Sequence, residues 1–277
     1  MRRCAKSCIH IAMDKLKVLD LFSGIGGFSL GLERTGGFET VAFCEIEEFQ
    51  RRVLNKNWPG TPIFHDVRTL TAESLRKRGI YHVDVICGGF PCQDISVAGR
   101  GTGINGSRSG LWSEIARLVG ELRPSVVIVE NSPALLSRGL GKVLGDLAEI
   151  GYDAEWECIP AASVGAPHIR DRIWILAYPG QELRPHVWGD IGHPELFPRR
   201  DYGDATEWSE DRELAPLVPG IDPGAPADWW IHQSRVDRTA NGLPGQLDRI
   251  GACGNAVVPQ IPELIGRAIL KAVGHAS

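Results

Sequence analysis

The chain has 277 residues, of which 43% are hydrophobic and 23% charged, which is enough apolar material for one sizeable core and a smaller appended lobe. Thirty Lys and Arg against 34 Asp and Glu give a net charge of −4, which argues against holding polyanions by bulk charge, although basic residues can still converge locally. No apolar stretch approaches the ~18 residues of a membrane helix, and the seven scattered cysteines fit no disulfide framework, so we expect a cytoplasmic protein without membrane contact.

Residues 1–15 are expected to be a disordered leader, and a start at Met13 instead of Met1 stays open. Cys4, Cys8 and His10 resemble part of a zinc site, but no second Cys/His pair lies nearby to complete four ligands. We therefore expect no metal site.

From residue 16 onward, short aliphatic runs alternate with helical patterns, which is typical of an α/β fold with helices on both faces of a parallel sheet. The predicted strands cover residues 17–22, 40–45, 61–66, 83–88, 125–130, 154–160 and 172–178. The predicted helices cover residues 26–35, 47–57, 71–79, 111–122, 134–150 and 257–272.

The pattern changes at Pro179, because residues 179–226 hold eight prolines and six glycines with little hydrophobic periodicity. Residues 179–248 carry 6 Lys and Arg against 13 Asp and Glu, a local charge of −7. We interpret 16–178 and 249–277 as one α/β domain, onto which the last helix docks, and 179–248 as a separate loop-rich lobe.

A glycine loop, Ser-Gly-Ile-Gly-Gly at residues 23–27, follows the first strand and opens a helix. Glycines permit a tight turn and close ligand approach, and the helix start offers free N–H groups. Glu45 ends the next strand, where a carboxylate can accept both ribose hydroxyls of a nucleoside. The loop departs from the G-x-G-x-x-G pattern because Ser29 replaces its last glycine. The features indicate an adenosine-containing cofactor, and the alternative is a tight turn beside a surface Glu.

Asp66 ends the third predicted strand. In such a sheet its loop could contact the amino group of an adenine. An N-cap for a helix over residues 67–79 is the other explanation for an Asp at this position.

The sequence Gly-Gly-Phe-Pro-Cys-Gln at residues 88–93 follows an apolar strand and leads into a glycine-rich stretch. This places Cys92 at the edge of the sheet where ligands of open α/β folds bind, as a candidate nucleophile. A cysteine buried as a small hydrophobic residue is the alternative, and it suits Cys44, Cys87 and Cys158 better.

Glu130 closes the next apolar strand, so partial desolvation could raise its pKa toward proton donation. A helix start at Pro133 is the structural alternative. Further on, Arg170 and Arg172 alternate onto one face, where two guanidiniums can clamp a phosphate or orient an acid.

In this order, the glycine loop, Pro91-Cys92-Gln93, Glu130-Asn131 and Arg170-x-Arg172 resemble the DNA cytosine-5 methyltransferases of bacteria and phages. Residues 254–259, Gly-Asn-Ala-Val-Val-Pro, are similar to the last motif of that family. The resemblance implies a Rossmann-like methyltransferase sheet with one antiparallel strand, and makes 179–248 the target-recognition lobe. Ser132 and His168 depart from the usual Val and Gln.

The resemblance also implies a mechanism. Cys92 attacks carbon 6 of a flipped-out cytosine, Glu130 protonates ring nitrogen 3, and S-adenosyl-L-methionine gives its methyl group to carbon 5. The arginines of Arg170-x-Arg172 lie near the catalytic pocket. The residues expected to bind the cofactor are Phe22, Ser23, Gly24, Gly26, Gly27, Glu45, Asp66, Pro91, Asn255 and Ala256.

The expected partner is double-stranded DNA, read at a short sequence by a monomer, in restriction-modification or phage protection. A cognate restriction endonuclease would act separately. An RNA cytosine-5 methyltransferase is the nearest alternative. A nicotinamide-dependent dehydrogenase would use the glycine loop and Glu45 but leaves Cys92 and Glu130 unexplained.

Overall fold

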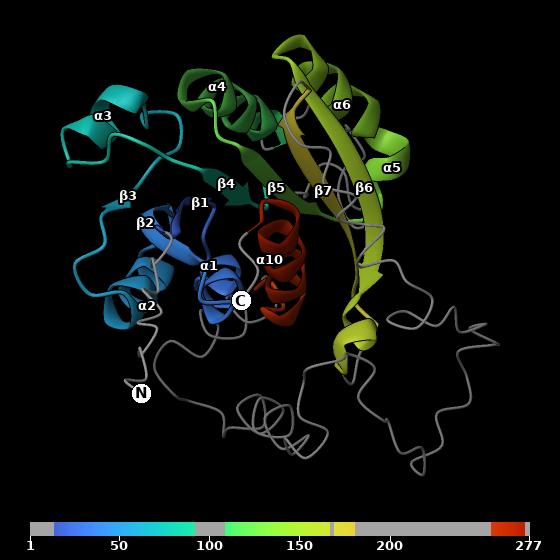
Figure 1. Ribbon diagram of the computed structural model, residues 1–277, viewed down its shortest axis with the longest axis horizontal. Coiled ribbons are helices and arrows are strands. Elements are labelled where there is room, and N and C mark those ends of the chain that lie inside the picture. The colour runs from blue at the N-terminus through green and yellow to red at the C-terminus, as the bar shows by residue number, and fades with distance from the viewer. Residues whose placement is uncertain (1–13, 92–108, 167–168, 181–255, 275–277) are drawn as a thin grey trace, which may run out of the picture.

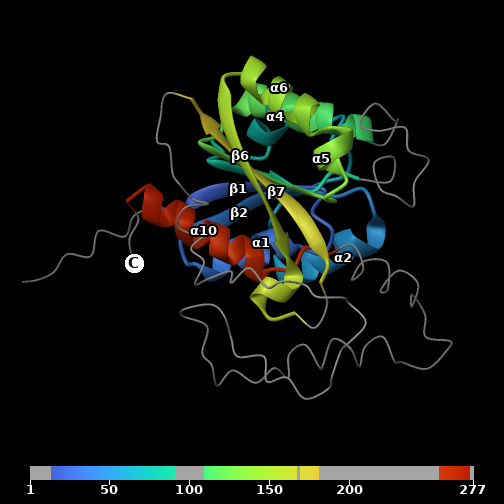
Figure 2. The same ribbon diagram turned by 90° about the vertical axis from the view of Figure 1, so that its right-hand side faces the viewer.

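A seven-stranded sheet with the order β3-β2-β1-β4-β5-β7-β6 is the centre of the computed structural model. The structure describes residues 14–91, 109–166, 169–180 and 256–274. Helices α4, α5 and α6 cover one face of the sheet, and α1, α2 and α10 cover the other (Figures 1 and 2).

The strands are β1 (Leu16–Leu21), β2 (Phe38–Cys44), β3 (Ile63–Phe64), β4 (Val85–Gly88), β5 (Val126–Asn131), β6 (Tyr152–Pro160) and β7 (Asp171–Pro179). The α-helices are α1 (Gly27–Arg34), α2 (Glu48–Asn57), α3 (Ala72–Arg76), α4 (Trp112–Leu122), α5 (Leu135–Arg138), α6 (Leu140–Glu149) and α10 (Gln260–Ala272). Short 3-10 turns lie at Ser109–Leu111 and Ala161–Val164. Among the helices of the described ranges, none is both long and apolar enough to cross a membrane.

Strands β1, β2, β3, β4 and β5 pair in parallel, whereas β7 runs antiparallel to both of its neighbours, β5 and β6. The sheet therefore contains one reversed strand, which confirms the α/β fold class and the Rossmann-like topology expected from the resemblance. Parallel pairing needs a crossover connection between strands, and the helices that follow each strand supply it.

Two apolar cores lie on opposite faces of the sheet, as expected when strands are buried on both sides. Trp112 and Leu118 of α4 anchor the first core, and Phe28 of α1 and Ile265 of α10 anchor the second. Helix α1, which follows the glycine loop, and the C-terminal helix therefore share the second core.

Three helix predictions need correction. The helix expected over 134–150 is divided into α5 and α6, because Gly139 has φ 176° and ψ −5°, outside the helical region. The helix expected over 71–79 ends at Arg76. The last helix begins at Gln260 instead of 257, with Pro259 at its N-cap.

Helix α10 packs against α1. A Cβ atom on Gly27 would lie 2.5 Å from the carbonyl oxygen of Val257, and Gly31 is similarly close to the carbonyl of Pro259. Such distances leave no room for a side chain, so these glycines allow the C-terminal segment to reach the glycine loop.

Candidate active site at the carboxyl edge of the sheet

Most of the predicted site residues converge at one edge of the sheet. Parallel strands β1, β2, β4 and β5 all end there, and the reversed strand β7 begins there. Ligands of open α/β sheets bind at this edge. Cys92 and Asn255 lie outside the described residues. Their neighbours on the chain, Pro91 and Ala256, are described and mark where these two segments reach the site.

The glycine loop after β1 has an unusual backbone. Phe22 has φ 52°, a left-handed value that a residue with a Cβ atom rarely adopts, and Gly24 and Gly26 have φ 54° and 88°. The ring of Trp58 fills the space beside Gly26, because a Cβ atom there would lie 2.6 Å from it. Backbone strain of this kind is concentrated at binding sites.

Ser23 closes the loop rather than pointing its hydroxyl at a ligand. The Ser23 hydroxyl donates to the carbonyl of Asp20 at 2.6 Å, and accepts from the N–H of Cys44 at 3.2 Å. These bonds join the ends of β1 and β2. The backbone is engaged as well, because the Ser23 N–H donates to the carbonyl of Cys44 at 3.2 Å and the Ser23 carbonyl accepts from the N–H of Gly26 at 2.8 Å. Ser23 therefore shapes the loop through both its side chain and its backbone.

Glu45 follows β2 directly and is buried beside the glycine loop. Its Oε2 accepts from the N–H of Gly24 at 2.7 Å, and its Oε1 accepts from the N–H of Glu47 at 2.8 Å. Burial raises the pKa of Glu45, against the opposing effect of these two bonds. A carboxylate can accept about four hydrogen bonds, so each oxygen retains acceptor capacity for a ribose hydroxyl.

Asp20 is a buried acid that the sequence analysis did not single out as functional. Its Oδ2 accepts from the hydroxyl of Ser29 at 2.7 Å, and both side chains are fully buried below the glycine loop. Burial raises the pKa of Asp20 to about 7, although the Ser29 bond acts in the other direction. Ser29, which interrupts the glycine pattern, is thus the partner of a buried carboxyl. The signal in the sequence that could have pointed to Asp20 is a charged residue within an apolar strand.

Asp66 lies in the turn after β3 and forms an ion pair with Arg68 at 2.6 Å. The hydrogen bond from Arg68 lowers the pKa of Asp66, which keeps it ionised. The N-cap alternative is wrong, because Thr71 caps α3 in a reciprocal capping box with Ser74.

Glu130 and Arg172, two predicted catalytic residues, form an ion pair on what we call the catalytic side of the site. Arg172 Nε lies 2.8 Å from Glu130 Oε1, and the Glu130 side chain is 13% exposed. Burial raises the pKa of Glu130, and Arg172 and Arg170 oppose this rise. The alternative that Glu130 serves a helix start is not supported, because its carboxylate pairs with β7 and α5 begins five residues later.

The Glu130 carboxylate also abuts the segment that leads to Cys92. A Cβ atom on Gly89 would lie 2.7 Å from Glu130 Oε2, so a side chain there would displace the carboxylate. The neighbouring Asn131 donates its amide to the carbonyl of Phe90 at 3.1 Å. The pair Glu130-Asn131 therefore holds the two residues that precede Pro91 and Cys92. The contacts of Gly89 and Asn131 depend on β4 and β5 being neighbours in the sheet. The sequence alone does not give this strand order.

Arg170 joins the catalytic side to the C-terminal segment. Its Nη2 donates to the carbonyl of Ala256 at 2.7 Å, and its backbone φ is 36°. Burial, followed by the charge of Arg172, lowers the pKa of Arg170. Since the next residue, Val257, packs against Gly27, the Arg170 bond holds the segment before α10 against both the glycine loop and β7.

Together, these residues suit a nucleoside cofactor with a positive charge. The glycine loop lets the ligand approach the backbone, the buried Glu45 offers acceptors for hydroxyls, and Asp66 offers an acceptor beyond it. Residues that could hold such a group are Phe22, Gly24, Gly26, Gly27, Glu45 and Asp66. Three or more side chains able to bind a metal ion do not come together anywhere in the described ranges.

The sheet order, the single reversed strand and the acid Glu45 beside the glycine loop are those of a Rossmann-like methyltransferase. The model of the family described as C-5 cytosine-specific DNA methylase matches residues 16–188, so the chain belongs to this family. The dehydrogenase alternative is thereby excluded.

Relatives in the family support this assignment. The chain is 38% identical over 190 residues to the Type II methyltransferase M2.BsuMI of Bacillus subtilis (strain 168), covering 65% of this chain and 47% of that protein. It is 36% identical over 163 residues to the Type II methyltransferase M.CviJI of Paramecium bursaria Chlorella virus IL3A, covering 58% and 42%. The chain thus spans less than half the length of these relatives.

Solved structures show the same fold. A structure described as a DNA modification methyltransferase encoded within an E. coli prophage has a TM-score of 0.61 at 20% identity, covering 94% of this chain and 100% of that one. A DNMT2 mutant of Spodoptera frugiperda has a TM-score of 0.51 at 23% identity, covering 60% and 51%.

Proposed function

We propose that this protein transfers a methyl group from S-adenosyl-L-methionine to carbon 5 of cytosine in double-stranded DNA, as a DNA (cytosine-5-)-methyltransferase. The observation that carries this proposal is the buried Glu130 carboxylate, held by Arg172 and placed against Gly89, three residues before Cys92. This arrangement brings an acid close to the chain segment that bears the only nucleophile suggested by the motifs.

The chemistry requires these two residue types. A pyrimidine carbon is a poor nucleophile until a thiolate adds to carbon 6, and an acid at ring nitrogen 3 neutralises the charge that this addition creates. The Cys92 thiolate forms the bond to carbon 6 while Glu130 gives its proton to nitrogen 3. Bound S-adenosyl-L-methionine supplies the methyl group. Loss of the carbon 5 proton to solvent then breaks the carbon–sulfur bond and returns the Cys92 thiolate, and the nitrogen 3 proton goes back to Glu130.

The target base has to leave the duplex, because its reacting atoms are not accessible within the base stack. We assign sequence selection to residues 179–248, whose local charge of −7 makes this lobe a poor phosphate anchor. Phosphate contacts would then come from the catalytic domain, residues 16–178 and 249–277. We place the protein in the cytoplasm as a monomer, in a restriction-modification or phage-protection system, with any cognate endonuclease acting separately.

Covalent trapping tests the proposal directly. The full chain is incubated with S-adenosyl-L-methionine and duplex DNA in which cytosines are replaced by 5-fluorocytosine. Fluorine cannot leave as the proton does, so the protein is expected to remain bound to DNA on a denaturing gel. Omission of the cofactor is the control. Trapping on 5-fluorocytosine RNA but not on DNA would instead support the RNA methyltransferase alternative.

The place of the cofactor is tested at Glu45. Glu45→Ala is expected to weaken S-adenosyl-L-methionine binding by about 1–3 kcal/mol, because it removes a carboxylate that accepts hydrogen bonds. Isothermal titration calorimetry measures this change. Glu47→Ala is the matched control, since Glu47 is exposed and its hydrogen bond to Glu45 comes from its backbone N–H, which alanine keeps. Equal affinity of the Glu45→Ala variant and the wild type would contradict the assignment.

A further inference from the structure

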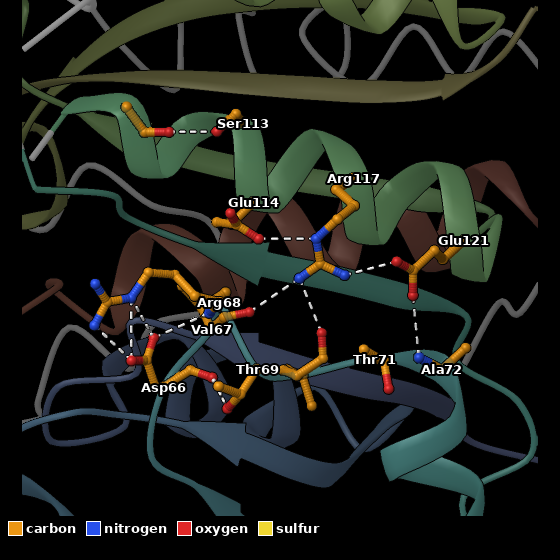
Figure 3. A network of polar contacts seen from close by, with 12 residues as sticks. Asp66, Val67, Arg68, Thr69, Thr71, Ala72, Ser113, Glu114, Arg117 and Glu121 are labelled. Atoms are coloured by element: carbon orange, nitrogen blue, oxygen red, sulfur yellow. Dashed lines mark hydrogen bonds and ion pairs between the residues drawn. The ribbon is translucent and has the colours of Figure 1, made fainter. Parts of the chain in front are cut away.

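Arg117, on α4, binds the turn that carries Asp66. Its Nη2 donates to the carbonyl oxygens of Val67 at 3.0 Å and of Leu70 at 2.9 Å (Figure 3). These carbonyls lie some 50 residues before Arg117 in the chain, so the contact is a tertiary one.

The guanidinium is itself held in place on α4. Arg117 Nε lies 2.8 Å from Glu114 and Nη1 lies 2.6 Å from Glu121 (Figure 3). Glu121 also accepts from the N–H of Ala72 at 3.1 Å, at the far end of the turn. The two residues thereby fix the turn over residues 67–72 from α4.

The turn begins beside the cofactor side of the site. The N–H of Glu45 donates to the carbonyl of Phe64 at 2.9 Å, two residues before Asp66. Cys44, the residue before Glu45, is the register partner of Phe64 in the parallel pair of β2 and β3, so the ends of these two strands lie side by side. The position of Asp66 relative to Glu45 therefore depends on how the turn is held.

The first turn of α4 is anchored to the catalytic side. Trp112 packs against Phe90 with ring centroids 5.7 Å apart, and its Nε1 donates to Asp146 at 2.8 Å. Phe90 lies two residues before Cys92. Helix α4 is thus fixed to the segment before the nucleophile at one end and to the Asp66 turn along its length.

From these contacts we propose that Arg117 is a positioning residue for the adenosine portion of the cofactor. It acts by setting the distance between Asp66 and Glu45, and does not touch the cofactor itself. The inference rests on the proposed function. Arginine suits this role because its planar fork can bond two carbonyls and two carboxylates at once, which the single ammonium of lysine cannot do.

The test measures binding of S-adenosylhomocysteine to the full chain by calorimetry. Arg117→Met is expected to weaken binding about ten-fold, and Arg117→Lys to have a smaller effect because lysine can still reach one acceptor. Arg267→Met is the matched control, because Arg267 pairs with Glu263 at 2.8 Å on the exposed side of α10. This variant should bind S-adenosylhomocysteine with the affinity of the wild type. If Arg117→Met does not fold, Arg117→Lys carries the comparison.

Two further measurements distinguish positioning from general support of the fold. In methyl transfer to amplified, unmethylated bacterial DNA, Arg117→Met should raise the KM for S-adenosyl-L-methionine about ten-fold and leave kcat within about two-fold. In a double-mutant cycle, Arg117→Met and Asp66→Asn should be non-additive in binding S-adenosylhomocysteine, because both act through one turn.

The outcomes separate the two proposals. If the wild type does not bind S-adenosylhomocysteine, the proposed cofactor is wrong, and this inference is wrong with it. If the wild type binds and the folded Arg117 variants bind equally well, only this inference is overturned. Additive effects of Arg117→Met and Asp66→Asn, or a loss confined to kcat, would also overturn it.

Discussion

Replacing Cys92 with serine is expected to lower methyl transfer by at least several orders of magnitude, while binding of S-adenosyl-L-methionine persists. A thiolate forms to a useful extent near neutral pH, whereas a serine hydroxyl supplies almost no nucleophilic anion there. The glycine loop and Glu45 do not depend on the thiol, so the cofactor affinity should be unchanged. Initial rates with tritiated cofactor, together with calorimetry, measure the two quantities separately.

Cys158→Ser is the matched control for this substitution. Cys158 lies on β6, partly buried, and burial raises the pKa of its thiol, which makes it a poor nucleophile. This variant should retain the wild-type rate. Substantial turnover by purified Cys92→Ser, or a comparable loss in Cys158→Ser, would contradict the covalent mechanism.

The sequence predicts the catalytic side of the site because its residues end strands. Glu130 closes an apolar run, and in a parallel sheet such runs end at a common edge. Arg172 begins a strand on the far side of Glu130, and the antiparallel pairing of β5 with β7 brings the two together. The resemblance to a family supplies this reversed strand, which periodicity alone does not distinguish from a parallel one.

Contacts that depend on three-dimensional neighbours could not be predicted. In the sequence, Arg117 has the position of an ordinary charged residue on an amphipathic helix. Nothing in the local sequence indicates that it donates hydrogen bonds to the carbonyls of residues 67 and 70. Ser29 reads as a departure from the glycine pattern, although it is the hydrogen-bond partner of Asp20. The division of α5 from α6 at Gly139 was also missed, because a single glycine is often tolerated within a helix.

The predicted cofactor residues of the glycine loop lie at one edge of the sheet, but their hydrogen bonds limit which of their atoms could contact a cofactor. Ser23 uses its hydroxyl to join β1 and β2. Asp66 is paired with Arg68, so an adenine would have to share or displace that partner. Motifs identify which residues gather at a site, whereas hydrogen-bond partners decide which atoms remain available.

Replacing Glu130 with glutamine is expected to lower kcat by about 10²- to 10⁴-fold, the usual contribution of a general acid. Glutamine keeps the shape and can hydrogen-bond the ring, but it cannot release a proton to nitrogen 3. The substitution also leaves Arg172 without a charged partner. The Glu130→Gln variant should therefore be compared with Arg172→Lys, which keeps a positive charge beside Glu130. Single-turnover rates at saturating cofactor measure the chemical step.

The pH dependence identifies the proton that Glu130 provides. Because burial raises the pKa of Glu130 above its ordinary value, the protonated acid persists to higher pH than in an exposed glutamate. The wild-type rate should fall as the pH rises through this raised pKa, and the residual rate of Glu130→Gln should lack that decline. Glu157→Gln, an exposed glutamate on β6, is the control and should reproduce the wild-type profile. A wild-type rate in Glu130→Gln would show that Glu130 is structural, and an unchanged pH profile would assign the proton to another group.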